Sequence, residues 1–278
     1  FQRYTPQIEP LALDEAFLDV TASVGLFGPA VNMAREIRQA IREELQLVAS
    51  VGVGPNKYIA KLASDVEKPD GFVVVEEAQV LDFLAPLPVR RIWGVGKVAA
   101  QTFDKLGIRT IGQLRHYPEQ LLRQHLGRSA EQFLRLAHGV DERPVVAEHE
   151  AKSVSNENTF AVDISDREMM RQWLHALTEQ VAQRLRAQGL KGRTVQLKLR
   201  SADFTTYTRS HTLAGATDIT AEIWRAVQEL FEQRLPRPLP AVRLLGVGVS
   251  NFAAEEQRQP DLFDSGDRQR QQKLDALV

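Results

Sequence analysis

The 278-residue sequence contains no cysteine, which excludes disulfides and thiolate metal sites and leads us to expect a reducing, cytoplasmic location. No apolar run approaches the length of a membrane span, and the first residues do not resemble a signal peptide. The six histidines show no ligand spacing, which argues against a zinc site. Ordinary shares of hydrophobic and charged residues remain, 43% and 26%, as expected for about two globular domains, or three small ones.

The near-zero net charge of −1 conceals an uneven distribution of charge along the chain. Residues 1–86 carry a net charge of −6, residues 87–150 of +3, residues 151–252 of +4 and residues 253–278 of −2. An acidic segment followed by two basic ones suits a protein that binds cations in one place and a polyanion in another. A chance fluctuation of a few charges is the alternative explanation.

The first 86 residues alternate short apolar runs with amphipathic segments. The run from Ile8 to Val20 is broken only by Asp14 and Glu15, which predicts a hairpin that reverses at this acidic pair. Apolar spacing indicates an α/β or α+β layer, with helices over 29–45, 56–65 and 79–84 and buried strands over 48–53 and 72–75.

The composition changes after residue 86. Short helices with glycine punctuation predict a small all-helical domain, and Asp141–Pro144 and the acidic stretch Glu148–Glu150 are interpreted as a linker in which little is expected to pack. Residues 253–278 read as a polar tail. Between linker and tail, a β-α-β-β-α-β order is predicted, with helices over 167–188 and 221–234 and strands over 153–160, 194–200, 205–213 and 243–252.

The acidic pair Asp14 and Glu15 is the first candidate site. A turn frees adjacent side chains from pointing to opposite faces of a sheet, so both carboxylates can converge on one hard cation. Magnesium prefers oxygen ligands, and a pair of magnesium ions is the usual device for phosphoryl transfer. A solvated hairpin tip is the alternative, and two carboxylates rarely suffice for two metals.

Two other segments are candidates for phosphate binding. Lys68 lies at a turn rich in proline and glycine, where a rigid lysine provides a point charge for a triphosphate. Gly94 and Gly96 flank one apolar residue ahead of a helix beginning near Lys97, a pattern typical of a helix-hairpin-helix whose backbone N–H groups bind a DNA phosphate. A plain glycine-rich turn between helices is the alternative.

The last two candidates lie in the C-terminal half. Lys198 and Arg200 are predicted on the open face of the four-stranded sheet, where they form either a platform for a phosphate backbone or an ordinary solvated face. In the tail, Gln259, Leu262 and Phe263 combine an amide with an isolated apolar anchor, as in short peptides that dock into a partner's pocket. Accidental hydrophobic residues are the alternative there.

Several segments together resemble Y-family translesion DNA polymerases, and the bacterial members most closely. The resemblance runs from Phe1 to about Phe252, and Gln259 to Phe263 is similar to the motif by which bacterial polymerases bind the sliding clamp. The segments are Tyr4–Thr21 (YTPQIEPLALDEAFLDVT), Val51–Lys57 (VGVGPNK), Ala60–Asp65 (AKLASD), Glu67–Gly71 (EKPDG) and Ile92–Lys97 (IWGVGK).

The resemblance implies an α+β multidomain fold and an enzyme that adds a dNTP to a primer 3′-OH with two Mg²⁺ ions. The implied partners are primer-template DNA, dNTP and the sliding clamp, and the protein is expected to act as a monomer. The implied domains are a palm with part of a ferredoxin-like sheet (1–86), a thumb with the helix-hairpin-helix (87–143), a linker (144–152), a little finger (153–252) and a tail (253–278).

Individual roles follow by matching residues to the family's motifs. Asp14 and Glu15 match two palm metal ligands, and Lys68 matches the lysine that contacts the triphosphate. Ala12 stands where the family has serine, a change that we expect to be harmless. The residues expected to contact DNA are Gly94, Gly96, Lys97, Lys152, Ser153, Lys198 and Arg200.

The family's first metal-binding aspartate, its ribonucleotide-excluding aromatic residue and its fingers have no counterpart in the sequence. We therefore expect that the chain begins inside a longer protein, a distributive polymerase without proofreading, which supplies a third carboxylate. We also expect that the chain by itself extends primers negligibly. The alternative function is a non-catalytic module that holds DNA and the clamp.

Overall fold

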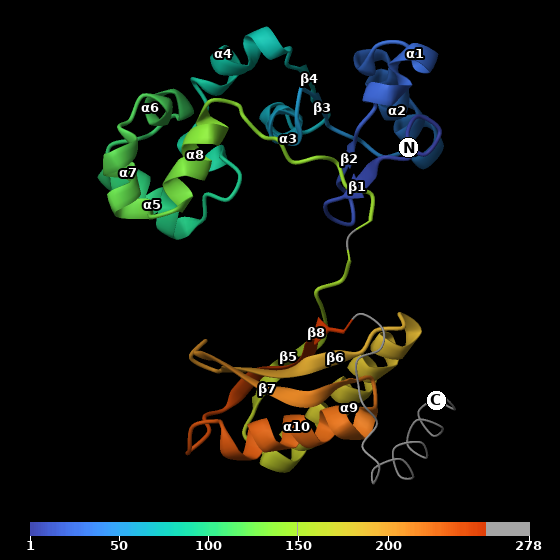
Figure 1. Ribbon diagram of the computed structural model, residues 1–278, viewed down its shortest axis with the longest axis vertical. Helices are drawn as coiled ribbons and strands as arrows, with labels where there is room; N and C mark the ends of the chain where they lie inside the picture. Colours follow the sequence, from blue (N-terminus) through green and yellow to red (C-terminus); the bar gives the residue numbers. More distant parts are fainter. Residues whose placement is uncertain (149, 254–278) are drawn as a thin grey trace. The chain divides into compact units, whose positions relative to one another are not determined.

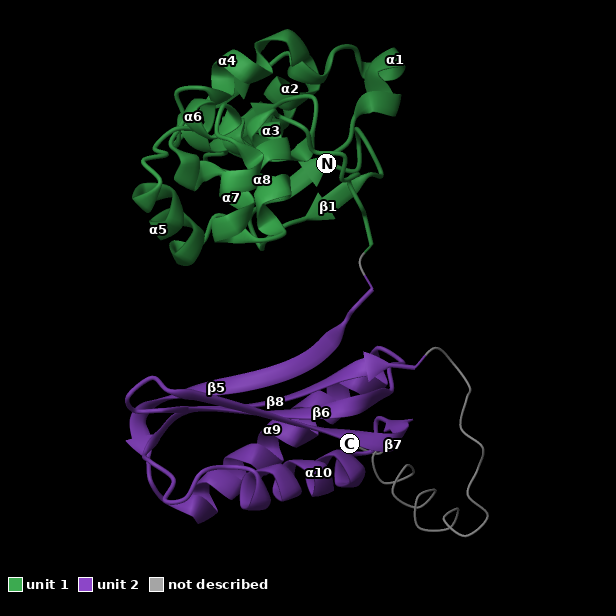
Figure 2. Cartoon of the chain, turned by 60° about the vertical axis from the view of Figure 1, so that its left-hand side comes forward, with its two compact units in different colours: residues 1–149 green, residues 150–278 purple. Residues whose placement is uncertain are grey.

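The computed structural model describes residues 1–148 and 150–253. These residues belong to two compact units, residues 1–149 (unit 1) and 150–278 (unit 2), which Figure 2 shows in separate colours. A search of the described helices found none with the length and apolar character needed to cross a membrane.

Unit 1 begins with the predicted hairpin. Strand β1 (Ile8–Pro10) pairs antiparallel with β2 (Ala16–Leu18), and the chain reverses at the acidic pair between them. The 3-10 helix η1 (Thr21–Ser23) and helices α1 (Val24–Phe27) and α2 (Ala30–Leu45) follow. Strand β3 (Val51–Val53) then pairs in parallel with β4 (Phe72–Val74), and helix α3 (Lys57–Val66) connects the two.

The sheet structure of unit 1 differs from the expected part of a ferredoxin-like sheet. Among the described residues, the β1-β2 pair and the β3-β4 pair are separate two-stranded sheets. Each strand is three residues long, below the usual length of about five or six residues. The predicted strand over 48–53 is correspondingly shortened to Val51–Val53.

The rest of unit 1 is helical, as predicted, and it shares one core with α3. Ile59 and Leu62 of α3 pack in the same buried cluster as Phe103, Ile111 and Leu114. Residues 1–86 and 87–143 are therefore joined by a common apolar core within one compact unit. The elements are η2 (Glu77–Gln79), α4 (Val80–Leu84), η3 (Val89–Arg91), α5 (Lys97–Lys105), α6 (Ile111–Arg115), α7 (Glu119–Leu126) and α8 (Ser129–Ala137).

Residues 139–146, which we call the strap, run without regular secondary structure but are fastened to unit 1. The Asn56 side chain donates to the Gly139 carbonyl at 2.8 Å, and Lys57 Nζ donates to the Pro144 carbonyl at 3.1 Å. The Arg143 guanidinium lies 4.3 Å from the centre of the Trp93 ring. The expectation that little would pack in the linker is therefore wrong for residues 141–144, where polar and cationic contacts replace apolar ones.

Unit 2 confirms the predicted β-α-β-β-α-β order. Its strands form one antiparallel sheet in the order β5-β8-β6-β7, and both helices lie on the same face of it (Figure 1). Apolar side chains such as Val195, Leu197 and Leu199 point into the core beneath these helices. The bounds are β5 (Ser153–Ile164), α9 (Arg167–Ala187), β6 (Gly192–Ser201), β7 (Thr206–Thr217), α10 (Thr220–Gln233) and β8 (Val242–Phe252).

Candidate functional site

The acidic turn between β1 and β2 is closed by its own backbone. The N–H groups of Leu11 and Ala12 both donate to the Glu15 carbonyl, at 2.8 and 3.2 Å. This closure leaves the Asp14 side chain exposed, and among the described residues its carboxylate makes no hydrogen bond or ion pair. Asp14 is therefore available to bind a cation.

Glu15 belongs to a cluster of four charged side chains. Its Oε1 accepts a hydrogen bond from Lys61 Nζ at 2.9 Å and lies 3.5 Å from Lys68 Nζ. Asp65 binds the same two lysines, with Nζ–Oδ distances of 3.2 Å to Lys61 and 2.7 Å to Lys68. We call Glu15, Lys61, Asp65 and Lys68 the charged cluster. It balances two carboxylates against two ammonium groups.

Contacts within the charged cluster favour the ionised forms of Glu15 and Lys68. The hydrogen bond from Lys61 holds the pKa of Glu15 below its usual value, against the opposing effect of partial burial. The hydrogen bond to Asp65 likewise raises the pKa of Lys68. Both groups are therefore charged at neutral pH.

The charged cluster brings together two of the residues singled out from the sequence and adds two others. Glu15 and Lys68 come from turns that lie more than fifty positions apart in the chain, and the structure places them in contact. Lys61 and Asp65 were not predicted as site residues. Their spacing along α3 is the i,i+4 signal of a helical ion pair, which could have indicated them.

The residues present are chemically suited to a hard divalent cation. Carboxylate oxygens are the preferred ligands of magnesium, and Asp14 offers two that are free. Glu15 offers the second carboxylate, although Lys61 and Lys68 occupy one of its oxygens. Over residues 1–148 and 150–253, no group of three or more His, Cys, Asp or Glu side chains is arranged to hold a metal ion. The described chain thus provides two neighbouring carboxylates.

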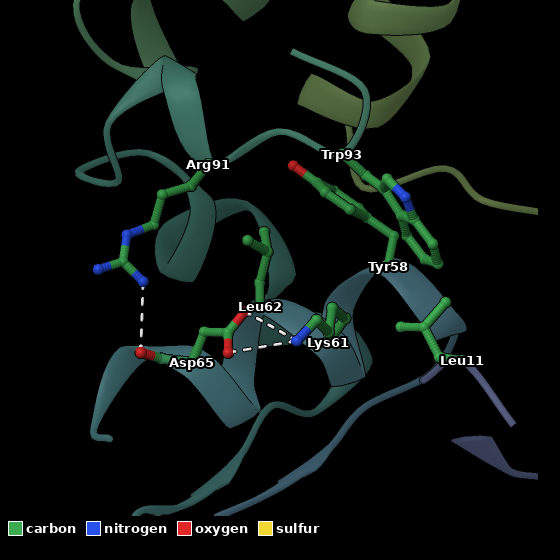
Figure 3. Close-up of a pocket in the computed structure, with 7 residues that line it drawn as sticks. All are labelled: Leu11, Tyr58, Lys61, Leu62, Asp65, Arg91 and Trp93. Atoms are coloured by element: carbon green, nitrogen blue, oxygen red, sulfur yellow. Dashed lines mark hydrogen bonds and ion pairs between the residues drawn. The ribbon is translucent and has the colours of Figure 1, made fainter. Parts of the chain in front are cut away.

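A pocket of about 200 Å³ adjoins the charged cluster (Figure 3). Arg91 closes one side of it, where its Nη1 donates to the Asp65 carbonyl at 3.3 Å. Its walls come from the acidic turn, from α3 and from the segment before Gly94. The lining residues are Leu11, Tyr58, Lys61, Leu62, Asp65, Arg91 and Trp93.

The predicted phosphate-binding glycines lie at the start of α5. Gly94 has a φ of +92°, a left-handed conformation that favours glycine, and Gly96 is the N-cap of α5. Ala100 N donates to the Gly96 carbonyl at 3.0 Å, so the N–H groups of the residues between them point out of the helix end. Lys97 is exposed beside them. The element before this turn is the 3-10 helix η3 rather than a longer helix.

The open face of the unit 2 sheet carries both predicted cations. Lys198 Nζ is 2.7 Å from Glu157 Oε2, and Arg200 Nε donates to Thr206 Oγ1 at 3.0 Å. Gly246 of the neighbouring strand β8 lies in register with both Glu157 and Lys198. Because glycine has no side chain, nothing projects from the sheet between these two residues. At the start of β5, Lys152 and Ser153 are exposed. Gln259, Leu262 and Phe263 lie outside the described residues.

Comparison with known proteins establishes the family. The profile of the impB/mucB/samB family matches residues 1–65, that of its C-terminal domain residues 151–262, and that of the IMS family HHH motif residues 77–108. A DNA polymerase IV from Desulfatibacillum aliphaticivorans is 41% identical over 100% of this chain and 71% of its own length. The chain belongs to the DNA polymerase IV family. This is a branch of the Y family, and its members are DNA-directed DNA polymerases.

Further relatives agree with this assignment. The DNA polymerase IV of Brucella melitensis biotype 1 is 42% identical over 94% of this chain and 58% of its own length. A solved Y-family DNA polymerase chimera of Dbh and Dpo4 matches with a TM-score of 0.78 and 25% identity, over 91% of this chain and 73% of that structure. The chain thus spans between about three fifths and three quarters of the length of these relatives.

Proposed function

We propose that the full gene product is a translesion DNA polymerase that adds a dNTP to a primer 3′-OH, and that unit 1 contains part of its catalytic site. The observation that carries this proposal is the meeting of Glu15 and Lys68 at 3.5 Å beside the free carboxylate of Asp14. Metal ligands and a phosphate-binding cation must lie this close together for a metal-bound triphosphate to reach both.

Asp14 and Glu15 are the proposed ligands of Mg²⁺. When bound, two such ions supply positive charge that stabilises the attacking and leaving oxygens in phosphoryl transfer. Lys68 would approach the triphosphate as a point charge, and its contact with Glu15 would be released for this. Lys61 keeps Glu15 ionised and oriented.

The remaining predicted residues bind DNA in this proposal. The outward N–H groups after Gly96, at the start of α5, hold a primer phosphate, with Lys97 adding charge. Lys152, Ser153, Lys198 and Arg200 contact the template from unit 2. Residues 1–86 are then the palm, 87–143 the thumb, 144–152 the linker and 153–252 the little finger. In the tail, Gln259 to Phe263 binds the sliding clamp, and the protein acts as a monomer.

The chain by itself is proposed to extend primers negligibly. Two neighbouring carboxylates are a small ligand set for a pair of metal ions, and the described residues add no third ligand. The second candidate function, a non-catalytic module that holds DNA and the clamp, is favoured by the same observation.

A primer-extension assay with Mg²⁺ separates these proposals. We expect template-directed incorporation by the full gene product and none above background by residues 1–278. Incorporation by residues 1–278 would overturn the proposed inactivity of the chain. If the full gene product binds primer-template DNA but incorporates no nucleotide, the polymerase proposal is wrong and the binding module stands. Replacing Leu262 and Phe263 by Ala should remove clamp binding and leave DNA affinity unchanged.

A further inference from the structure

The turn that carries Lys68 is held in place from one side by close backbone packing. A Cβ atom on Gly71 would lie 2.7 Å from the Glu67 carbonyl oxygen, so the two ends of the turn nearly touch. The Gly71 carbonyl accepts from Val51 N at 2.9 Å, which ties the turn to the start of β3. Residue 71 therefore cannot shift without disturbing the β3-β4 pair.

Asp70 holds the same turn from the other side, through helix α2. Arg38 Nη2 donates to Asp70 Oδ1 at 2.6 Å and to the Asp70 carbonyl at 2.5 Å, and Arg38 Nε donates to Oδ1 at 3.1 Å. Arg42 bonds to the second carboxylate oxygen. Asp70 has a φ of +61°, a conformation that aspartate and asparagine adopt more readily than most residues.

These contacts have a consequence for Lys68, two positions before Asp70. Its backbone is fixed by the turn, whereas its side chain is 47% exposed and, among residues 1–148 and 150–253, is held only by Asp65 and Glu15. How far the Lys68 ammonium group reaches toward Asp14 and Glu15 is thus set by the place where the turn that carries Lys68 is anchored. Arg38 is 26% exposed and Asp70 36%, so this anchor is partly shielded from water.

We propose that Asp70, with its partners Arg38 and Arg42, is a positioning residue that holds Lys68 at the acidic turn to receive a nucleoside triphosphate. The inference rests on the proposed function, because it presumes that Lys68 contacts the triphosphate. It adds that helix α2 determines nucleotide affinity, although α2 contributes none of the predicted site residues. Arg38 and Arg42 of α2 act through the Asp70 carboxylate.

Steady-state incorporation of a single nucleotide by the full gene product tests this inference. Asp70→Asn keeps a residue that tolerates the left-handed conformation and removes the charge that the arginines bind. We expect Asp70→Asn and Arg38→Ala each to raise KM for the dNTP about threefold to tenfold and to change kcat by less than about twofold, as fits the loss of a partly exposed ion-pair network. The double variant should raise KM by less than the product of the two single effects, since both changes act on the same ion-pair network.

The matched control is Arg35→Ala, on the same helix. Arg35 lies 5.5 Å from the centre of the Phe72 ring, as Arg38 lies 5.8 Å from it, but within the described chain it has no ion pair with Asp70. Its KM should equal that of the wild type. If Asp70→Asn does not fold, Arg38→Ala and Arg42→Ala carry the test, because both leave the backbone of the turn unchanged.

Lys68→Ala separates failure of the inference from failure of the proposed function. We expect Lys68→Ala to raise KM for the dNTP, and Asp70→Asn to add nothing further in that background. An unchanged KM in Lys68→Ala would overturn the role proposed for Lys68 itself, and with it this inference. If Lys68→Ala raises KM while Asp70→Asn does not, or if Asp70→Asn acts equally without Lys68, the positioning role of Asp70 is wrong and the polymerase proposal is untouched.

Discussion

Each of the two units is stabilised internally in a different way. Unit 2 is built on four strands of 10 to 12 residues that form one sheet over a continuous apolar core. Unit 1 contains four strands of three residues each, and its candidate site lies on turns whose side chains are joined by ion pairs. Long strands make a structure robust to single substitutions, whereas a site on short elements depends on a few polar contacts. Unit 1 should therefore respond more strongly to the loss of single charges.

The largest expected effect concerns the buried ion pair of Glu9 and Lys57. Both side chains are 9% exposed, Lys57 Nζ lies 2.7 and 2.5 Å from the two carboxylate oxygens, and Glu9 also accepts from Val146 N of the strap at 2.8 Å. Lys57→Met leaves that carboxylate buried without its cation, which costs about 3 to 5 kcal/mol. Hydrogen exchange resolved by peptide should show the loss in unit 1 only.

Arg123→Met is the matched control for this prediction, because it breaks the exposed pair with Glu119 in the same unit. It should cost less than about 0.5 kcal/mol. The double variant Glu9→Gln with Lys57→Met should recover part of the stability lost in Lys57→Met. If the amides of unit 1 are protected equally from hydrogen exchange in Lys57→Met and Arg123→Met, the view that buried polar contacts stabilise unit 1 is wrong.

The second prediction tests whether the open face of unit 2 binds a polyanion. Replacing Lys198 and Arg200 together by Ala should weaken DNA binding to a similar extent for all sequences. The slope of log K against log salt concentration should fall by about 1 to 2, because two phosphate contacts are lost. Fluorescence anisotropy over a salt series measures this slope. Arg225→Ala, on α10, is the control and should leave the slope unchanged.

The smallest expected effect is a pH dependence in unit 2. Glu232 binds Arg171 at 2.8 Å and Arg167 at 2.7 Å, and the hydrogen bond from Arg171 is the main cause that lowers its carboxyl pKa below the usual 4.5. A lowered pKa stabilises the fold above pH 4.5, and this stabilisation is lost as the pH falls through the folded-state value.

The difference in Tm between the wild type and Glu232→Gln should therefore be largest near pH 7 and should shrink below pH 4.5. At neutral pH it should correspond to about 0.5 kcal/mol, since the carboxylate is one third exposed and screened by water. A difference that grows on acidification would contradict this assignment.

The same contrast between the units explains how much could be predicted. In unit 2 the alternation of Val195, Leu197 and Leu199 with polar residues predicted both a strand and the face that it buries. Similar patterns in the other segments predicted the order of strands and helices. The ends of some elements were missed, such as the extension of β5 to Ile164 and the start of α10 at Thr220. In unit 1 the hairpin at Asp14 and Glu15 was predicted, because turn residues interrupt an apolar run.

Contacts between distant polar residues were not predictable from local patterns. The strap reads as a linker by composition, and only the fold brings Arg143 to Trp93 and Val146 to Glu9. The anchoring of Asp70 by Arg38 has the same character, since it joins positions 32 apart through charge rather than periodicity. Lys61 and Asp65 were nearer to prediction, because their helical spacing is visible in the sequence.

The most direct test of the central claim is the rate of single-turnover incorporation by the full gene product with Asp14→Asn. The measurement uses saturating Mg²⁺, dNTP and primer-template DNA, with DNA affinity determined in parallel. If Asp14 is a metal ligand, the rate falls at least about a hundredfold while DNA affinity stays within about twofold. A rate within about threefold of the wild type would contradict the claim that the turn between β1 and β2 binds the catalytic metal.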